Sequence, residues 1–193
     1  MSLPRMSAAC LLAALALSQP ARAQEPTLRG PWLGAGIGTA SAAVNCDICT
    51  TDRNGGLSGH IAVGFTFSPT LRAGAEVAGW QDNTNDIRQR LMLYGASLYW
   101  TPTPGASWYL KGGVGMMTYN AEDVEDEEDD PLGASTGALQ LGAGYDFRAG
   151  SKLWFTPYVN LMVSTSGNLT SGNSIVTDAS FSLMQVGAGL TWR

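Results

Sequence analysis

Three groups of residues in this sequence have side chains that could do chemistry. Cys46 and Cys49 are separated by two residues, a spacing that suits a disulfide, a metal site or thiol–disulfide exchange. The stretch Glu122–Asp130 contains eight carboxylates in nine residues, and carboxylate oxygens are ligands for divalent cations. His60 is the only histidine and follows Ser58 by two residues, which leaves a hydrolytic His–Ser pair open. Each group has a simpler structural explanation.

The cysteine pair favours a disulfide within one loop. Secreted proteins keep their cysteines oxidised, and the N-terminus described below is that of a secreted chain. Zinc would need about four ligands, and only His60 could join the two thiols. Redox exchange expects a thioredoxin-like βαβ context, which the sequence lacks. We predict a Cys46–Cys49 disulfide, while a zinc site, a redox role and two free thiols remain alternatives.

The acidic stretch favours a solvated loop, because so many like charges repel one another in a regular element. Weak binding of a divalent cation is the alternative. The spacing of the carboxylates differs from that of an EF-hand, so tight binding is not expected. The candidate cation ligands are Glu122, Asp123, Glu125, Asp126, Glu127, Glu128, Asp129 and Asp130. We expect no catalytic residue, no cofactor and no dedicated metal site elsewhere in the chain.

The N-terminus has the three parts of a secretory signal peptide. Arg5 precedes the apolar run Ala8–Leu17, and Ala21-Arg22-Ala23 provides small residues for cleavage. We therefore predict a signal peptide over residues 1–23 and a single domain over residues 24–193. Without the leader, 9 basic residues face 16 acidic ones, and half of the acidic residues lie in Glu122–Asp130. No cluster of Lys or Arg is available to neutralise phosphates, which disfavours a nucleic-acid partner.

The rest of the chain repeats a strand pattern eight times, with large apolar residues at every second position. The intervening phase is small or polar and rich in glycine. This alternation places the two sets on opposite faces of each strand, although a soluble sandwich would show the same period. The polar side chains of the second phase that we expect to form a network inside a barrel are His60, Arg72, Glu76, Lys111, Gln140, Asp146, Asn160 and Gln185.

The lengths of the connections distinguish a membrane barrel from a sandwich. Long and short connections alternate along the chain, as they do when one rim of an up-and-down barrel carries turns and the other carries loops. Each repeat of the strand pattern is about 10–13 residues long, which matches the ~9–11 residues that a tilted strand needs to cross a bilayer. The expected long connections are Val44–Gly55, Gln81–Ile87, Asn120–Ser135 and Thr165–Ser180. Rings expected near the two membrane interfaces are Trp32, Phe67, Trp80, Trp100, Trp108, Phe147, Trp154 and Trp192.

We therefore predict an all-β fold, a closed eight-stranded antiparallel up-and-down transmembrane β-barrel. Eight strands leave an interior just wide enough for side chains, and buried charges need partners. We expect a filled lumen and not an open pore. His60 falls in the inward phase, so we expect it to be buried and hydrogen-bonded.

Three segments carry a resemblance to a known family: PWLGAGIG at residues 31–38, the Cys46–Cys49 loop that leads into GLSGHIAVGFTFSPTLRAGAE, and FSLMQVGAGLTW at residues 181–192. With them the chain resembles the small outer-membrane β-barrels of the OmpA transmembrane-domain, OmpX and opacity-protein type. The family ends its last strand on an aromatic residue, whereas here Arg193 follows Trp192. Because only Arg193 follows Trp192 in this sequence, we do not expect the peptidoglycan anchoring of full-length OmpA.

The resemblance implies an integral protein of the Gram-negative outer membrane with both termini in the periplasm. It implies contact with outer-membrane lipid and lipopolysaccharide, and a monomer. The expected function is structural or a surface interaction, adhesion included, through extracellular loops that could bind an extracellular or host ligand. The alternatives are a lipid A-modifying enzyme and a narrow small-solute channel.

Overall fold

The computed structural model describes residues 29–45, 53–84, 87–123, 132–165, 167–171 and 174–193. All elements in these ranges are β-strands: β1 (Gly30–Asn45), β2 (Arg53–Ser68), β3 (Leu71–Thr84), β4 (Ile87–Trp100), β5 (Trp108–Asp123), β6 (Leu132–Tyr145), β7 (Phe147–Arg148), β8 (Leu153–Ser164), β9 (Gly167–Ser171) and β10 (Ser174–Trp192). Among the described residues, no helix is long and apolar enough to cross a membrane.

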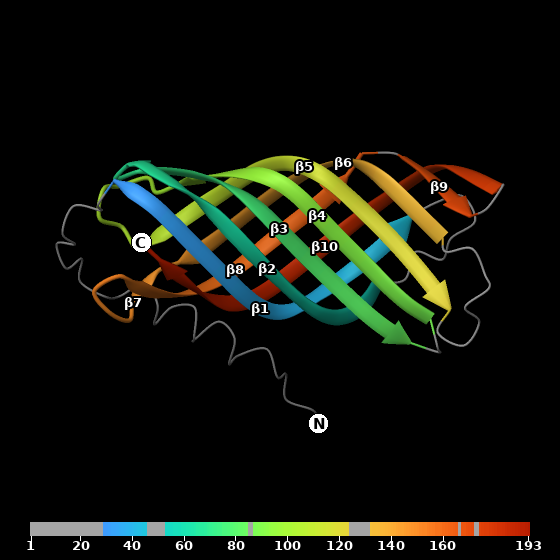
Figure 1. Ribbon diagram of the computed structural model, residues 1–193, viewed down its shortest axis with the longest axis horizontal. Helices are drawn as coiled ribbons and strands as arrows, with labels where there is room; N and C mark the ends of the chain where they lie inside the picture. The colour runs from blue at the N-terminus through green and yellow to red at the C-terminus, as the bar shows by residue number, and fades with distance from the viewer. Residues whose placement is uncertain (1–28, 46–52, 85–86, 124–131, 166, 172–173) are drawn as a thin grey trace, which may run out of the picture.

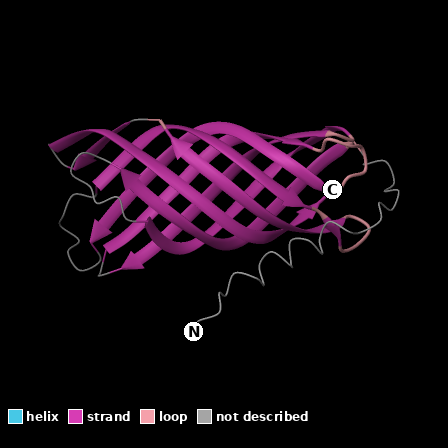
Figure 2. Cartoon of the chain, turned by 180° about the vertical axis from the view of Figure 1, so that it is seen from behind, coloured by secondary structure: helices cyan, strands magenta, loops and turns pink. Residues whose placement is uncertain are grey.

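The strands close into a barrel in which chain neighbours pair in antiparallel fashion. The first and last strands complete the circle, with Leu33 opposite Trp192 and Asn45 opposite Ser180. The ten labelled strands make eight wall segments, because β7 continues β6 and β9 continues β8 along the same wall. Figures 1 and 2 show the strands crossing the long axis of the barrel at a steep tilt. The predicted closed eight-stranded antiparallel barrel is confirmed.

One end of the barrel carries the short turns and the C-terminus. The N–H of Thr101 donates to the carbonyl of Thr70, and Gly105 adopts a φ of 81° in the turn between β4 and β5. The N–H of Arg193 donates to the carbonyl of Lys152 at this same end (Figure 1). Short turns are typical of the periplasmic rim of bacterial barrels, and we call this end the periplasmic end for that reason.

The alternation assigns the two faces of the wall as expected. Large apolar side chains of one phase are exposed on the outside, where lipid covers a membrane barrel; examples are Leu33, Ile37, Ile61, Val114, Leu141 and Val186. The other phase is buried inside, and it includes Arg72, Glu76 and Lys111. Charged side chains that turn to the axis and apolar ones that turn outward are the arrangement of a membrane barrel.

Three rings predicted at the interfaces do not face outward. Trp32 and Trp80 are only 3% and 2% exposed and lie inside the barrel. Each of the two is next in sequence to an outward-facing residue, and adjacent residues of a strand point to opposite faces. Trp154 is also out of phase, and its ring lies 4.3 Å from the guanidinium carbon of Arg193. The remaining predicted rings are exposed on the outer wall: Phe67, Trp100, Trp108, Phe147 and Trp192.

The strands extend further at the outer end than the sequence pattern predicts. Most wall strands have 14 to 16 residues, whereas the sequence pattern predicts about 10–13. The predicted connection Gln81–Ile87 consists largely of paired strand, since β3 ends at Thr84 and β4 begins at Ile87. The predicted connection Thr165–Ser180 contains β9 and the first residues of β10. The barrel therefore continues beyond the thickness that a bilayer requires.

Candidate functional site

The barrel interior is the best-defined candidate site, and its periplasmic part is built around Arg72. The guanidinium of Arg72 forms an ion pair with Asp146 at 3.3 Å. It also packs against the rings of Tyr109, Tyr99 and Trp32, at 5.0, 5.3 and 5.7 Å from their centroids. Cations over aromatic faces are attracted by the ring quadrupole, which offsets part of the cost of burying the charge. Three inward rings and one carboxylate thus hold this cation.

Three side chains contact the buried carboxylate of Asp146. Besides Arg72 it accepts a hydrogen bond from Thr156 at 2.8 Å and an ion pair from Arg193 at 3.1 Å. Asp146 interrupts the strand between β6 and β7, and Arg193 is the residue that follows β10. Arg193, which departs from the family pattern, therefore turns its side chain inward to Asp146.

The central part of the interior is built around Glu76. Lys111 Nζ donates to Glu76 Oε1 at 2.8 Å, and Tyr99 and Ser97 each donate to Oε2 at 3.0 Å. Gln140 in turn donates to the hydroxyl of Ser97. The side chains of Glu76 and Lys111 are 0% and 4% exposed, so the pair is withdrawn from solvent. Both carboxylate oxygens of Glu76 accept hydrogen bonds, and Lys111 supplies the opposite charge, which offsets the cost of burying the pair.

Glycines make room for this central group. Glu76 lies directly across from Gly95 on β4, so no side chain separates it from Lys111 on β5. Gly36 lies where a methyl group would be 2.7 Å from the ring of His60 and 2.8 Å from that of Tyr158. Both positions lack the space for any larger residue, which explains the glycine-rich inward phase of the sequence.

The remaining predicted network residues lie beside this group. Asn160 donates to Gln185 at 2.9 Å, and Gln185 donates in turn to the carbonyl of Gly59 at 3.4 Å. His60 is placed differently from the expectation. Its ring meets Tyr158 edge to face at 4.5 Å, and its Nδ1 is buried with no hydrogen-bond partner among the described residues. His60 is therefore held by ring packing and not by hydrogen bonds at Nδ1.

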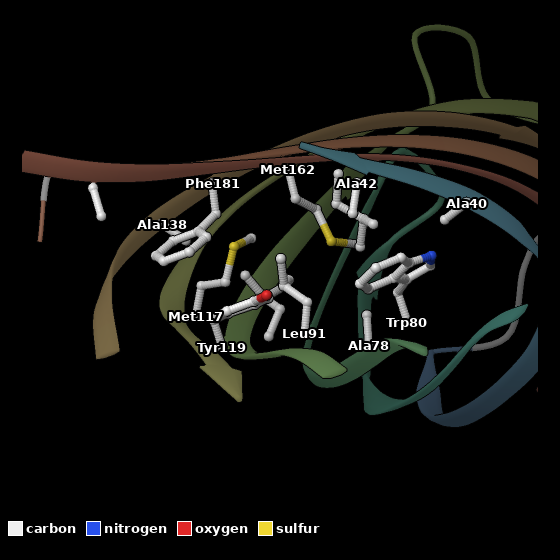
Figure 3. Packing of buried hydrophobic residues seen from close by; sticks show 13 residues of the cluster. Ala40, Ala42, Ala78, Trp80, Leu91, Met117, Tyr119, Ala138, Met162 and Phe181 are labelled. Atoms are coloured by element: carbon white, nitrogen blue, oxygen red, sulfur yellow. The ribbon is translucent and has the colours of Figure 1, made fainter. Parts of the chain in front are cut away.

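The outer part of the interior is apolar, which sequence reasoning missed. Figure 3 shows side chains from several strands packed against one another in this region. Phe181 stacks on the ring of Tyr119 at 5.3 Å between centroids. The fully buried members are Leu91, Leu93, Met117, Met162, Phe181 and Leu183, with Trp80 beside them. We call this set, together with Tyr119, the apolar plug.

A cavity of about 20 Å³ lies between Trp32, His60, Arg72, Tyr99 and Tyr158, among others. This is room for about one water molecule. The apolar plug, whose side chains are mostly hydrocarbon, fills the interior nearer the outer end.

The other chemical candidates do not form a reaction centre in the described part of the chain. Ser58 and His60 are both turned to the interior, and the Ser58 hydroxyl has no hydrogen-bond partner there. No three His, Cys, Asp or Glu side chains of the described ranges lie close enough to hold a metal ion. Cys46, Cys49 and residues 124–131 lie outside the described residues. Glu122 is described and lies 3.6 Å from Arg88 and 3.7 Å from Arg90.

A family model described as the outer membrane protein beta-barrel domain matches residues 8–193. The chain belongs to this family. It is an outer-membrane β-barrel protein, in agreement with the resemblance found in the sequence and with the outward apolar wall. A comparison with curated protein sequences finds no match.

Solved structures of outer-membrane barrels have the same fold. Neisserial surface protein A is 13% identical, with a TM-score of 0.59, and the match covers 88% of this chain and 99% of that one. Ail, the attachment invasion locus protein of Yersinia pestis, is 16% identical, with a TM-score of 0.55 over 86% of this chain and 100% of that one. A second Ail structure, in complex with the heparin analogue sucrose octasulfate, gives 14% and 0.54, over 84% of this chain and 99% of that one. At these identities the likeness shows the fold.

Proposed function

We propose that this outer-membrane barrel acts at the cell surface, as a structural and ligand-binding protein and not as a channel or an enzyme. The observation that carries the proposal is the closed interior, in which paired charges lie beneath the apolar plug. If the lumen is filled, a ligand can bind only at the outer rim or at the lipid-facing wall. Loops on a rigid scaffold are the usual location of recognition.

The outer rim supports this proposal through its polar surface. Arg53 donates to the hydroxyls of Ser41 and Ser182 across two neighbouring strands, at 3.1 and 3.2 Å. These hydrogen bonds link neighbouring strands at the outer end of the wall, where the connections begin. The acidic stretch follows Glu122 at this rim, so its charge favours a basic partner or one bridged by divalent cations. The sulfated ligand of the Ail complex would be repelled here.

The channel alternative predicts steady conductance, and we expect none. Full-length mature protein reconstituted into planar bilayers should leave the membrane current at its baseline over a range of voltages, because the apolar plug excludes ions. The enzyme alternative predicts altered lipid A, so the lipid A mass profile of a deletion strain should match that of the parent. Steady single-channel steps, or a changed profile, would overturn the corresponding part of the proposal.

Shortening one connection at each end of the barrel tests whether the outer rim takes part in adhesion. Replacing residues 124–131 with an Asn-Gly turn should lower adherence of expressing cells to epithelial monolayers several-fold, because the turn joins β5 to β6 without the acidic stretch. The matched control shortens the turn Thr101–Ser107 at the opposite end and should adhere like the parent. Heat-modifiable gel migration checks that both variants fold. Equal adherence of all three proteins contradicts a surface role for this loop.

A further inference from the structure

The seam between β1 and β10 is the junction of the wall that joins the two ends of the chain. In the described part of the chain, every other junction joins wall segments that follow one another in sequence, whereas Leu33 lies across from Trp192 here. Pairing of distant segments has to overcome the entropy of closing a long loop, so it forms after the local hairpins. The seam is therefore the part of the wall that we expect to close last.

The inner face of the seam carries no side chains at the middle of the barrel. The inward residues of β1 at this level are Gly36 and Gly38, and they lie across from Gly189 and Gly187 on β10. A pair of strands without inward side chains gains no packing contacts on that face. The two strands therefore contribute no inward packing of their own at this level.

Two rings from the flanking strands cover this bare face. His60 comes from β2, the neighbour of β1, and Tyr158 comes from β8, the neighbour of β10. Their rings meet edge to face, with 4.5 Å between the centroids. A methyl group on Gly36 would lie 2.7 Å from the ring of His60 and 2.8 Å from that of Tyr158. One on Gly187 would lie 2.5 Å from the hydroxyl of Tyr158, so the two rings meet directly over the glycines of the seam.

Two polar contacts cross β1 nearer the outer end. Gln185 on β10 donates to the carbonyl of Gly59 on β2 at 3.4 Å. Arg53 on β2 donates to the hydroxyl of Ser182 on β10 at 3.2 Å. The wall on either side of β1 is thus joined at three levels, and of the three contacts the ring pair is the one that packs on the seam glycines.

We propose that the rings of His60 and Tyr158 form a clasp that holds the seam closed, and that parting them lets β1 and β10 separate while the rest of the wall stays paired. Neither Nδ1 of His60 nor the hydroxyl of Tyr158 has a hydrogen-bond partner among the described residues. The clasp is therefore a contact between rings, and edge-to-face pairs stabilise beyond the area that they bury. Separated strands would expose two edges that other strands can join, so the clasp also protects the barrel from strand exchange.

Hydrogen–deuterium exchange of the full mature protein in detergent micelles, followed by mass spectrometry, tests this proposal strand by strand. Tyr158→Ala removes one ring and should speed amide exchange in β1 and β10 about tenfold, while exchange in β3, β4 and β5 stays as in the wild type. Tyr158→Phe keeps the ring and loses only a hydroxyl without a partner in the described structure, so it should exchange like the wild type. Equal acceleration in every strand of Tyr158→Ala would show a general loss of stability and overturn the clasp.

A pair of glycine variants tests the clasp without removing either ring. Gly36→Ala places a methyl group against both rings and should also speed exchange in β1 and β10 about tenfold. The matched control Gly34→Ala lies two residues away on the same face of β1, where a methyl group meets nothing closer than the Thr191 hydroxyl at 3.6 Å. It should exchange like the wild type.

Heat-modifiable gel migration checks that each variant folds. If Tyr158→Ala does not fold, Gly36→Ala and Gly34→Ala still decide the question. Unchanged exchange at the seam of Gly36→Ala contradicts the clasp, as does equal acceleration in the two glycine variants. Exchange at the seam of Tyr158→Phe as fast as that of Tyr158→Ala would assign the effect to the hydroxyl, which also overturns the proposal.

Discussion

Replacing Lys111 with methionine is expected to destabilise the folded barrel by about 3–5 kcal/mol, the usual cost of leaving a buried charge without its partner. Lys111 is the cation that lies against Glu76, and both side chains are withdrawn from solvent. Methionine fills a similar volume, so the lost charge and not a cavity is what the variant measures. Urea unfolding in detergent micelles, followed by tryptophan fluorescence, gives the free energy of unfolding.

The double variant Glu76→Gln/Lys111→Met provides the control for this prediction. It removes both charges while the amide keeps acceptor and donor groups beside Ser97 and Tyr99, so most of the lost stability should return. Arg88→Gln, at the exposed rim, should change the free energy of unfolding by less than about 1 kcal/mol. A single variant as stable as the wild type would show that the ion pair does not hold the interior together.

The sequence predicts the membrane part of this wall well, because there one phase meets lipid and the other meets a narrow lumen. Outward apolar residues and an inward phase of glycine and charge follow from that contrast. Which charges meet is not predictable in the same way. Glu76 and Lys111 lie on β3 and β5, with β4 between them, and their meeting depends on the register that sets Glu76 across from Gly95. Register is a property of the closed barrel and not of any one strand.

The outer part of the wall escaped sequence reasoning for a different physical reason. At the outer end of the wall the polarity of the two faces inverts while the strand phase continues: Leu91 points inward, and Arg90 and Gln81 face outward. The apolar-out, polar-in pattern stops at this level of β3, and for that reason the sequence predicts a connection that begins at Gln81. The same inversion places the apolar plug inside and the polar rim outside. The phase of each aromatic ring, and not its distance from a turn, decides whether it faces lipid, as Trp80 shows.

Phe181→Ala is expected to cost about 3–5 kcal/mol in the free energy of unfolding, the range for truncating a buried aromatic residue. Phe181 is 1% exposed, stacks on Tyr119 and belongs to the apolar plug. Its truncation loses the transfer of the ring out of water and also leaves a cavity that the closed wall cannot collapse to fill. The same urea experiment in micelles measures both contributions together.

Phe155→Ala separates the two contributions, because Phe155 is 45% exposed on the outer wall. Detergent or lipid chains fill the space that its ring leaves, so this variant loses the transfer contribution alone and should be the milder of the two. The cavity in Phe181→Ala gives a second signature: an apolar cavity of this kind binds benzene, so saturating benzene should restore part of the stability of Phe181→Ala and none of that of Phe155→Ala. Equal losses in the two variants, without a benzene effect, would mean that the outer interior is loosely packed and open to solvent. Ions could then enter the interior from the cell surface, and we would expect current steps in the planar-bilayer experiment.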